Sequence, residues 1–311
     1  MNSPITISDR IGLAKRSLLG TAIGDAFGDS FFGETTAILR HIEQRTIPES
    51  GWKFTDDTVM SIAVFEQIEK HGGIDQDELV KQFIKNQKTD PNRGYGATLR
   101  RLLREVQEGG NWRVLAAKVF DGMGSMGNGA AMRVSTIGAY WFDHLEKVKE
   151  LTTLSAVVSH TNKEAIAGAI AIAIATALST RSRLKSVTIK SQDFIEEVVR
   201  HLPESDTKTK IAKGLTVSRG SHPDFLITIL GNGSKMLAQD TVPFAVWCAA
   251  HYSRHFEEAL WRAVSVLGDR DTICAMVGGI TIMSADDSTI PLAWINQVES
   301  YEASIFRSTT V

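Results

Sequence analysis

Two short acidic stretches of this chain, "FTDDTVM" at 54–60 and "GDRDT" at 268–272, carry residue types that could do chemistry. Each leads into an apolar run with the spacing of a buried helix. Neither has a histidine or cysteine among its polar residues, and carboxylate and hydroxyl oxygens are ligands that suit Mg²⁺ or Mn²⁺ better than zinc. The oxygen-bearing residues that could form one site are Thr55, Asp56, Asp57, Asp269, Asp271 and Thr272.

A second interpretation of the same residues is helix capping. Threonine and aspartate are favoured at helix N-termini, where their oxygens accept backbone N–H groups and a negative charge is stabilised. If the two helix starts meet in space, their oxygens could hold a pair of ions. If they do not meet, the aspartates are ordinary caps. Sequence spacing leaves both interpretations open.

The elements that position these stretches are predicted to be helices almost throughout. Alternation typical of a strand is confined to "SVTIK" at 186–190. Glycine and proline fall mostly between the helical patterns, without a repeat or a low-complexity linker. We therefore expect one all-α, multi-helix domain over residues 1–311, with its motif-bearing core at about 11–296. The predicted helices cover residues 11–27, 58–70, 76–87, 96–108, 111–120, 129–142, 144–157, 163–179, 191–201, 206–218, 243–251, 255–267 and 272–284.

Composition is that of an ordinary globular chain. The 311 residues are 43% hydrophobic and 23% charged, with a formal net charge of -2. This balance argues against general attraction to nucleic acid or to an anionic membrane, although a local basic pocket is compatible with it. The two cysteines, Cys248 and Cys274, are too few and too far apart for a zinc cage. They are expected to be buried free thiols, in keeping with a reducing compartment.

No membrane or secretory segment is expected. The longest apolar run, residues 165–178, is short for a bilayer span and rich in alanine, as in a helix buried on all sides. The opening residues "MNSPITISDR" lack the basic head and apolar stretch of a secretory signal. We expect a cytoplasmic protein, and we expect a monomer.

The two acidic stretches resemble the paired metal-binding motifs of the ADP-ribosylglycohydrolase family, which includes the dinitrogenase-reductase-activating glycohydrolases. Further matches follow in the order of that family. They are the opening helix and Gly-Asp turn "LLGTAIGDAFG" (18–28), "NRGYGATLRRLL" (92–103), the glycine-rich "GSMGNGAAMRVSTIGAY" (124–140) and "SHTNKEAIAGAIAIA" (159–173). One glycine-rich match alone is weak, whereas five matches in order are strong.

This resemblance implies an all-α fold that binds two Mg²⁺ (or Mn²⁺) ions through the six residues above. It assigns catalytic roles to Asp56, Asp57 and Glu34, where Glu34 matches a mobile family glutamate. It also implies that the glycine-rich loop wraps phosphates and ribose, in agreement with the close backbone approach that glycine permits. A flexible helix connection is the alternative for that loop. The substrate-binding residues that the resemblance implies are Tyr95, Gly96, Gly124, Ser125, Met126, Gly127, Asn128 and His160.

The activity implied is metal-dependent cleavage of the glycosidic bond between ADP-ribose and an acceptor. The acceptor is a protein arginine or serine side chain or a small-molecule conjugate, and the reaction reverses ADP-ribosylation. Two alternatives are a crystallin-like ADP-ribose-binding protein with reduced catalysis and an immunity protein against an ADP-ribosylating toxin. The sequence departs from the family's usual GGDTDT at Leu267 and Arg270, and neither departure removes a ligand.

Overall fold

The computed structural model describes residues 5–49 and 51–299, and over these residues the regular structure is helical throughout. The described residues form sixteen α-helices joined by loops, and three 3₁₀ turns lie among them. The predicted all-α class is confirmed. The elements are α1 (Ile7–Asp29), α2 (Thr35–Gln44), α3 (Asp56–His71), α4 (Gln76–Thr89), α5 (Ala97–Gln107), α6 (Trp112–Lys118), η1 (Asn128–Ala130), α7 (Ser135–Tyr140), α8 (Leu145–Val157), α9 (Lys163–Leu184), α10 (Ser191–Arg200), α11 (Asp206–Lys213), η2 (Gly214–Thr216), α12 (Pro223–Leu230), α13 (Ala238–His251), α14 (Phe256–Val264), α15 (Arg270–Thr281), η3 (Asp287–Thr289) and α16 (Leu292–Gln297).

Helix α1 packs along α15 over an extensive contact, and it also packs against α3 and α7. The close approach depends on small residues. A Cβ atom at Gly24 would lie 2.0 Å from the carbonyl oxygen of Cys274, and one at Gly20 would lie 2.4 Å from that of Gly278. Only glycine fits at such distances. This pairing places the N-terminus of α15 beside the N-terminus of α3, so that the two acidic stretches meet.

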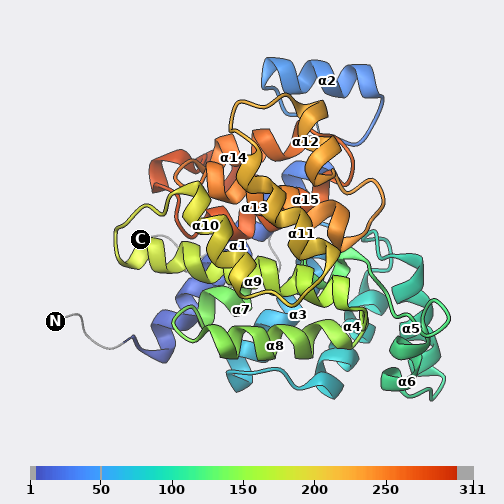
Figure 1. The fold of residues 1–311 in the computed structure, drawn as a ribbon. Coiled ribbons are helices and arrows are strands. Elements are labelled where there is room, and N and C mark those ends of the chain that lie inside the picture. The colour runs from blue at the N-terminus through green and yellow to red at the C-terminus, as the bar shows by residue number, and fades with distance from the viewer. Residues whose placement is uncertain (1–4, 50, 300–311) are drawn as a thin grey trace.

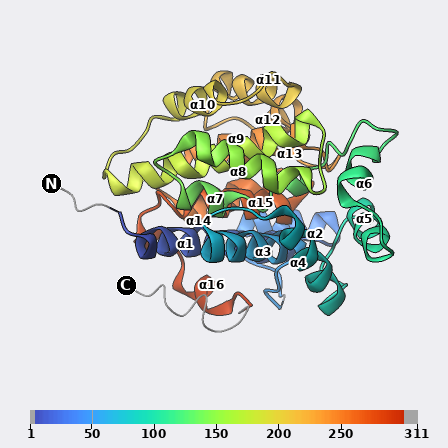
Figure 2. The same ribbon diagram turned by 90° about the horizontal axis from the view of Figure 1, so that it is seen from below.

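The helices stack in layers, as Figures 1 and 2 show. Helices α10 and α11 cover one side of α9 and α13, while α7 and α15 separate these from α1 and α3. Helices α5 and α6 project from one end of the stack in both views. The described residues form a single domain. The predicted domain of 1–311 also includes residues 1–4, 50 and 300–311, which lie outside the described part.

Helix α9 crosses the middle of these layers. It is the one helix of the described residues that is long and apolar enough to cross a membrane, but 89% of its apolar window is buried inside the protein. Its alanines and isoleucines contact α7, α8 and α13. The expectation of an internal helix at residues 165–178 is confirmed. Cys248 and Cys274 are buried free thiols, also as expected.

Several local expectations are wrong. Residues 186–190 form no strand, because Lys190 already caps α10 and the preceding residues only connect it to α9. The helix expected at 129–142 is split into η1 and α7. The Gly-Asp turn expected near Gly24 is instead the interior of α1, which continues without a break to Asp29. Helices α2, α12 and α16 were not predicted.

Candidate functional site

The N-terminus of α3 is fixed by a buried carboxylate on α1. Asp25 is fully buried and accepts hydrogen bonds from the backbone N–H groups of Thr55 (2.9 Å) and Thr58 (3.0 Å). The hydroxyls of the same two threonines also donate to it, at 2.9 and 2.6 Å. Because charge-assisted hydrogen bonds of this kind are strong, Asp25 sets the position of the first acidic stretch.

Capping of α3 is done by threonine and not by the neighbouring aspartates. The Thr55 hydroxyl accepts the N–H of Asp57 at 3.3 Å, and that threonine also donates to the Asp57 carboxylate at 3.1 Å. The Asp56 and Asp57 side chains form no cap hydrogen bond. The capping interpretation therefore accounts for Thr55 and leaves both carboxylates available for other chemistry.

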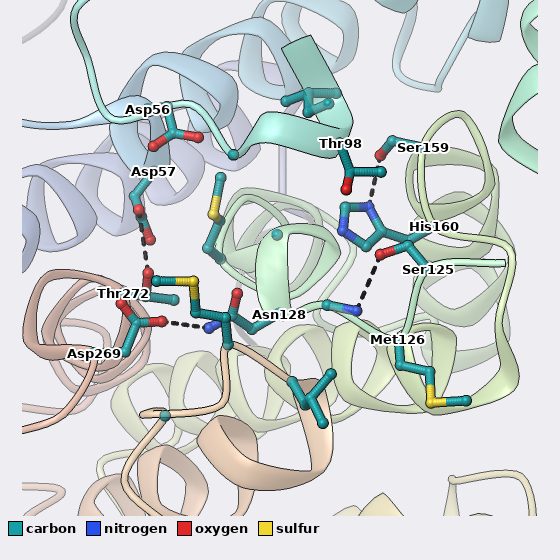
Figure 3. A pocket seen from close by; sticks show the side chains of 18 of the residues that line it. Asp56, Asp57, Thr98, Ser125, Met126, Asn128, Ser159, His160, Asp269 and Thr272 are labelled. Carbon is teal, nitrogen blue, oxygen red and sulfur yellow. Dashed lines mark hydrogen bonds between the residues drawn. The ribbon is translucent and has the colours of Figure 1, made fainter. Parts of the chain in front are cut away.

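The second acidic stretch begins α15 without a side-chain cap. Asp269 is the N-cap residue, yet its side chain forms no cap hydrogen bond. Instead it accepts from the Asn128 side-chain amide at 2.5 Å, and Thr272 donates to Asp57 at 3.4 Å. Figure 3 shows these residues facing one another across the end of a pocket. The two stretches thus share one site, which sequence spacing alone could not decide.

This site is one end of a cavity of about 840 Å³, a volume typical of small-molecule pockets. Figure 3 shows the aspartates on one side and a Ser159–His160 group on the other, with Asn128 between them. Most of the predicted site residues line the cavity. They are Asp56, Asp57, Gly96, Gly124, Ser125, Met126, Gly127, Asn128, His160, Asp269, Asp271 and Thr272.

The carboxylates at the acidic end are buried together, and this raises the pKa of each. Burial is the largest cause, because it disfavours the charged form, and repulsion between the neighbouring aspartates adds to it. The pKa of Asp56 and that of Asp271 rise to about 8, and the pKa of Asp57 rises well above its usual value. A cation bound between them would reverse this shift, since it stabilises the ionised forms.

The donor set fits a divalent cation. Asp57 Oδ1 and Asp271 Oδ1 are buried and accept no hydrogen bond from the described residues, which is unusual for carboxylate oxygens. However, no three histidine, cysteine, aspartate or glutamate side chains of residues 5–49 and 51–299 are arranged as a metal-ligand group. The structure therefore shows carboxylate oxygens that converge and lack hydrogen-bond partners, and the two-metal site itself remains a prediction.

The glycine-rich loop forms the middle wall of the cavity and is paired with a second loop. Gly127 and Leu237 form an antiparallel bridge, in which the Asn128 N–H donates to the Met236 carbonyl at 3.2 Å. A Cβ atom at Gly127 would lie 3.1 Å from His160 Nε2, so a larger residue would crowd the cavity wall. The loop is held in place by specific contacts and is more than a flexible connection.

His160 is held neutral at the far end of the cavity. Burial lowers its pKa to about 3, and the charge of the nearby Arg133 adds to this effect. Its Nδ1 pairs with the Ser159 hydroxyl at 2.8 Å. The fully buried Arg133 in turn donates to Ser159 and to the carbonyls of Ser155 and Gly129. Arg133 therefore braces the histidine and the end of the glycine-rich loop.

Three predicted site residues do not line the cavity. Thr55 is buried and contacts Asp25 and Asp57, as described above. Tyr95 is buried between two glycines that do line it. Glu34 is exposed and caps α2, accepting from the backbone N–H groups of Thr36 and Ala37 at 2.9 and 2.8 Å. The structure thus gives Glu34 a capping position and does not bring it to the aspartates.

Two parts of the site were missed by sequence reasoning. The family resemblance places Asp25 only in a Gly-Asp turn, although an aspartate inside a run of small and apolar residues is a signal of a buried polar role. The loop at 233–237 lines the cavity beside the glycine-rich loop, whereas the sequence indicates only a helix break at Gly231 to Gly233. Neither role follows from local spacing, because both depend on partners far along the chain.

The fold and cavity together define an all-α protein with an acidic, oxygen-rich pocket of nucleotide size. Residues 5–308 match the ADP-ribosylglycohydrolase family, and the chain belongs to this family. The chain is 26% identical to human "ADP-ribosylhydrolase ARH3" over 339 residues, covering 94% of this chain and 89% of the relative. It is 28% identical to an uncharacterized protein of Archaeoglobus fulgidus, covering 93% and 92% of the two chains.

A solved structure supports the fold assignment. An "ADP-ribosylglycohydrolase-related protein complex" aligns with a TM-score of 0.66 at 20% identity, covering 97% of this chain and 100% of that chain. At this identity the likeness concerns the fold alone. With the family match, it confirms the resemblance identified from the motifs.

Proposed function

We propose that this protein is a divalent-metal-dependent hydrolase that releases ADP-ribose from a modified acceptor. The acceptor is an arginine or serine side chain of a protein, or a small-molecule conjugate. Family membership supports a hydrolase acting on ADP-ribose linkages. The observation that carries the proposal is the meeting of two acidic helix N-termini at one end of a nucleotide-sized cavity.

The acidic end suits two Mg²⁺ or Mn²⁺ ions. When bound, such ions orient ribose hydroxyls and lower the pKa of water. They also supply the positive charge that buried aspartates need in order to stay ionised. The residues proposed to hold them are Asp56, Asp57, Asp269, Asp271 and Thr272, with Thr55 supporting Asp57 through a hydrogen bond.

The remaining steps belong to side chains and loops of this chain. The Asp56–Asp57 pair is proposed to accept a proton from the attacking water, because Glu34 lies outside the cavity. The glycine-rich loop offers backbone close to the diphosphate. His160 is neutral and lies beside that loop, so its ring can form a hydrogen bond with phosphate or ribose without adding charge to the cavity.

The test is release of ADP-ribose from arginine-linked and serine-linked peptides, each with Mg²⁺, with Mn²⁺ and with a chelator. We expect release from at least one peptide, and we expect the chelator to abolish it. Binding of free ADP-ribose without release from any conjugate would favour the crystallin-like alternative. Absence of both would overturn the proposal. An immunity role, a cytoplasmic location and a monomeric state stay predictions.

A further inference from the structure

Phe32 is an exposed aromatic residue at the acidic end of the cavity. It follows α1 directly, lines the cavity and is 48% exposed. Other exposed apolar side chains lie on the cavity wall, but Phe120 and Met123 precede Gly124, at the end where Asn162 donates to the Met123 carbonyl. The apolar surface of Phe32 is therefore separate from that of Phe120 and Met123.

Arg270 holds Phe32 in place. The guanidinium carbon lies 4.8 Å from the centroid of the Phe32 ring, and Nη1 donates to the Phe31 carbonyl at 2.6 Å. Arg270 lies between Asp269 and Asp271, so the ring is tied to the helix that presents two of the carboxylates. A cation over an aromatic face is stabilising and restricts where the ring can lie. Arg270 thus contacts both the Phe32 ring and the backbone beside it.

We propose that Phe32 contacts the acceptor of the ADP-ribose conjugate, and that Arg270 is a positioning residue for it. This inference rests on the proposed function. If the ribose carbon reacts at the aspartates and the diphosphate follows the glycine-rich loop, the acceptor must leave on the side away from that loop. Phe32 lies on that side. Its cavity-facing surface is an apolar wall against which the acceptor side chain and its flanking peptide can pack.

The experiment distinguishes a contact with the acceptor from a contact with the nucleotide. Phe32→Ala is compared with the natural protein in two measurements, kcat/KM on an ADP-ribosylated peptide and Kd for free ADP-ribose. We expect kcat/KM to fall roughly tenfold, mainly through a higher KM, the scale of losing one aromatic contact. The Kd for free ADP-ribose should be unchanged, because that ligand lacks the acceptor.

A matched control uses an aromatic residue of similar exposure away from the cavity. Phe225 on α12 is 50% exposed and does not line the cavity, so Phe225→Ala should leave both measurements unchanged. Melting temperature verifies that Phe32→Ala is folded, as expected for a half-exposed side chain.

The role of Arg270 is tested by a double-mutant cycle. Arg270→Thr should raise KM for the peptide without changing Kd for ADP-ribose, and Arg270→Lys should recover part of the loss because it keeps a cation near the ring. If Arg270 acts through Phe32, the double variant Phe32→Ala with Arg270→Thr should be no worse than Phe32→Ala alone. Additive losses would overturn the positioning role.

Two further results overturn the inference. One is unchanged peptide kinetics in Phe32→Ala, and the other is an equal loss of affinity for free ADP-ribose, which would place Phe32 against the nucleotide. A natural protein that neither binds ADP-ribose nor releases it from conjugates would instead overturn the proposed function, and this inference with it.

Discussion

A substitution at Asp57 distinguishes the capping interpretation of the first acidic stretch from the catalytic one. The Asp57→Asn substitution keeps the shape of the side chain, and Thr55, which caps α3, is untouched. We expect the variant to fold. Hydrolysis of an ADP-ribosylated peptide should fall roughly a hundredfold or more, the scale of losing a water-activating or charge-stabilising group. With a chelator present, its melting temperature should equal or exceed that of the natural protein, because one of the mutually repelling carboxylates is gone.

Asp193 offers a matched control for this substitution. It also lies in the first turn of a helix, α10, but it is exposed and away from the cavity. Asp193→Asn should leave hydrolysis unchanged. Near-normal hydrolysis by folded Asp57→Asn would show that the first acidic stretch is only a helix start.

His160 is predicted to stay neutral throughout the physiological range. Its pKa is lowered to about 3 by burial and by Arg133, so the ring gains no proton between about pH 5 and pH 8. Since the unfolded histidine titrates near pH 6.5, this group lowers the free energy of unfolding as pH falls from about 6.5 towards 3. An NMR titration of the His160 ring should show no shift from about pH 5 to pH 8. A midpoint inside that window would contradict the prediction.

At the residue scale, the sequence predicted which side chains form the site better than how they are held. The aspartates of both motifs could be named from their oxygens and from the family resemblance. Their convergence could not be derived, because it depends on glycines of α1 that admit α15. The role of Asp25 could not be derived for a related reason. Its four hydrogen bonds come from Thr55 and Thr58, which are separated from it in the sequence by α2.

Helix α1 acts as the support on which α3 is placed, and Asp25 is the contact that does this. Asp25→Ala leaves the donors of Thr55 and Thr58 without their acceptor inside the protein. We expect a loss of roughly 2–4 kcal/mol in the free energy of unfolding, the scale of breaking a buried hydrogen-bond network. Chemical denaturation measures it. Asp25→Asn should lose less, because it keeps one acceptor oxygen, and equal stability of Asp25→Ala and the natural protein would refute the anchoring role.

The glycine-rich loop is the element whose shape most directly controls ligand access. Gly127→Val adds a branched side chain, and its Cβ atom alone would lie 3.1 Å from His160 Nε2. We expect the affinity for ADP-ribose to fall at least tenfold, because the added methyl groups would keep the phosphates away from the backbone N–H groups of the loop. Calorimetry measures the affinity. Gly12→Ala is the comparison, since no atom lies within 4 Å of an added Cβ there and Gly12 does not line the cavity, and it should bind nearly as well.

At the element scale, periodicity found the long helices and several short ones, but it missed α2, α12 and α16. Helix α9, with its run of buried alanines and isoleucines, is recognised from composition alone. Helix α2 is mostly exposed and α16 spans six residues, so neither offers enough buried positions for a pattern. The expected strand at 186–190 shows the reverse error. Its alternating apolar residues connect α9 to α10 and pair with no other strand within the described residues.

The molecule as a whole gathers buried carboxylates that oppose folding unless their charge is compensated. In the presence of a chelator, Asp25 has a pKa of about 7 and Asp56 and Asp271 have pKa values of about 8, whereas an unfolded aspartate titrates near 3.9. Between about pH 4 and pH 8 the unfolded chain therefore binds fewer protons than the folded chain. The contribution of these groups to the free energy of unfolding is therefore highest below about pH 4, and it decreases as pH rises towards 8.

A divalent ion should reverse this trend, because it binds the ionised carboxylates and its affinity increases as they lose protons. Melting temperature is measured at about pH 6 and about pH 8, with a chelator and with Mg²⁺ at one fixed concentration, roughly a hundred times its Kd at pH 8. At pH 8 this excess adds about 2.7 kcal/mol, or about 4 °C for a chain of this size, and the increment at pH 6 should be smaller because the ion binds more weakly there. Sodium chloride at equal ionic strength should give no such increment, and Asp271→Asn should lose most of it. The same increment at both pH values, or in Asp271→Asn, would mean that magnesium stabilises the protein somewhere other than at these aspartates.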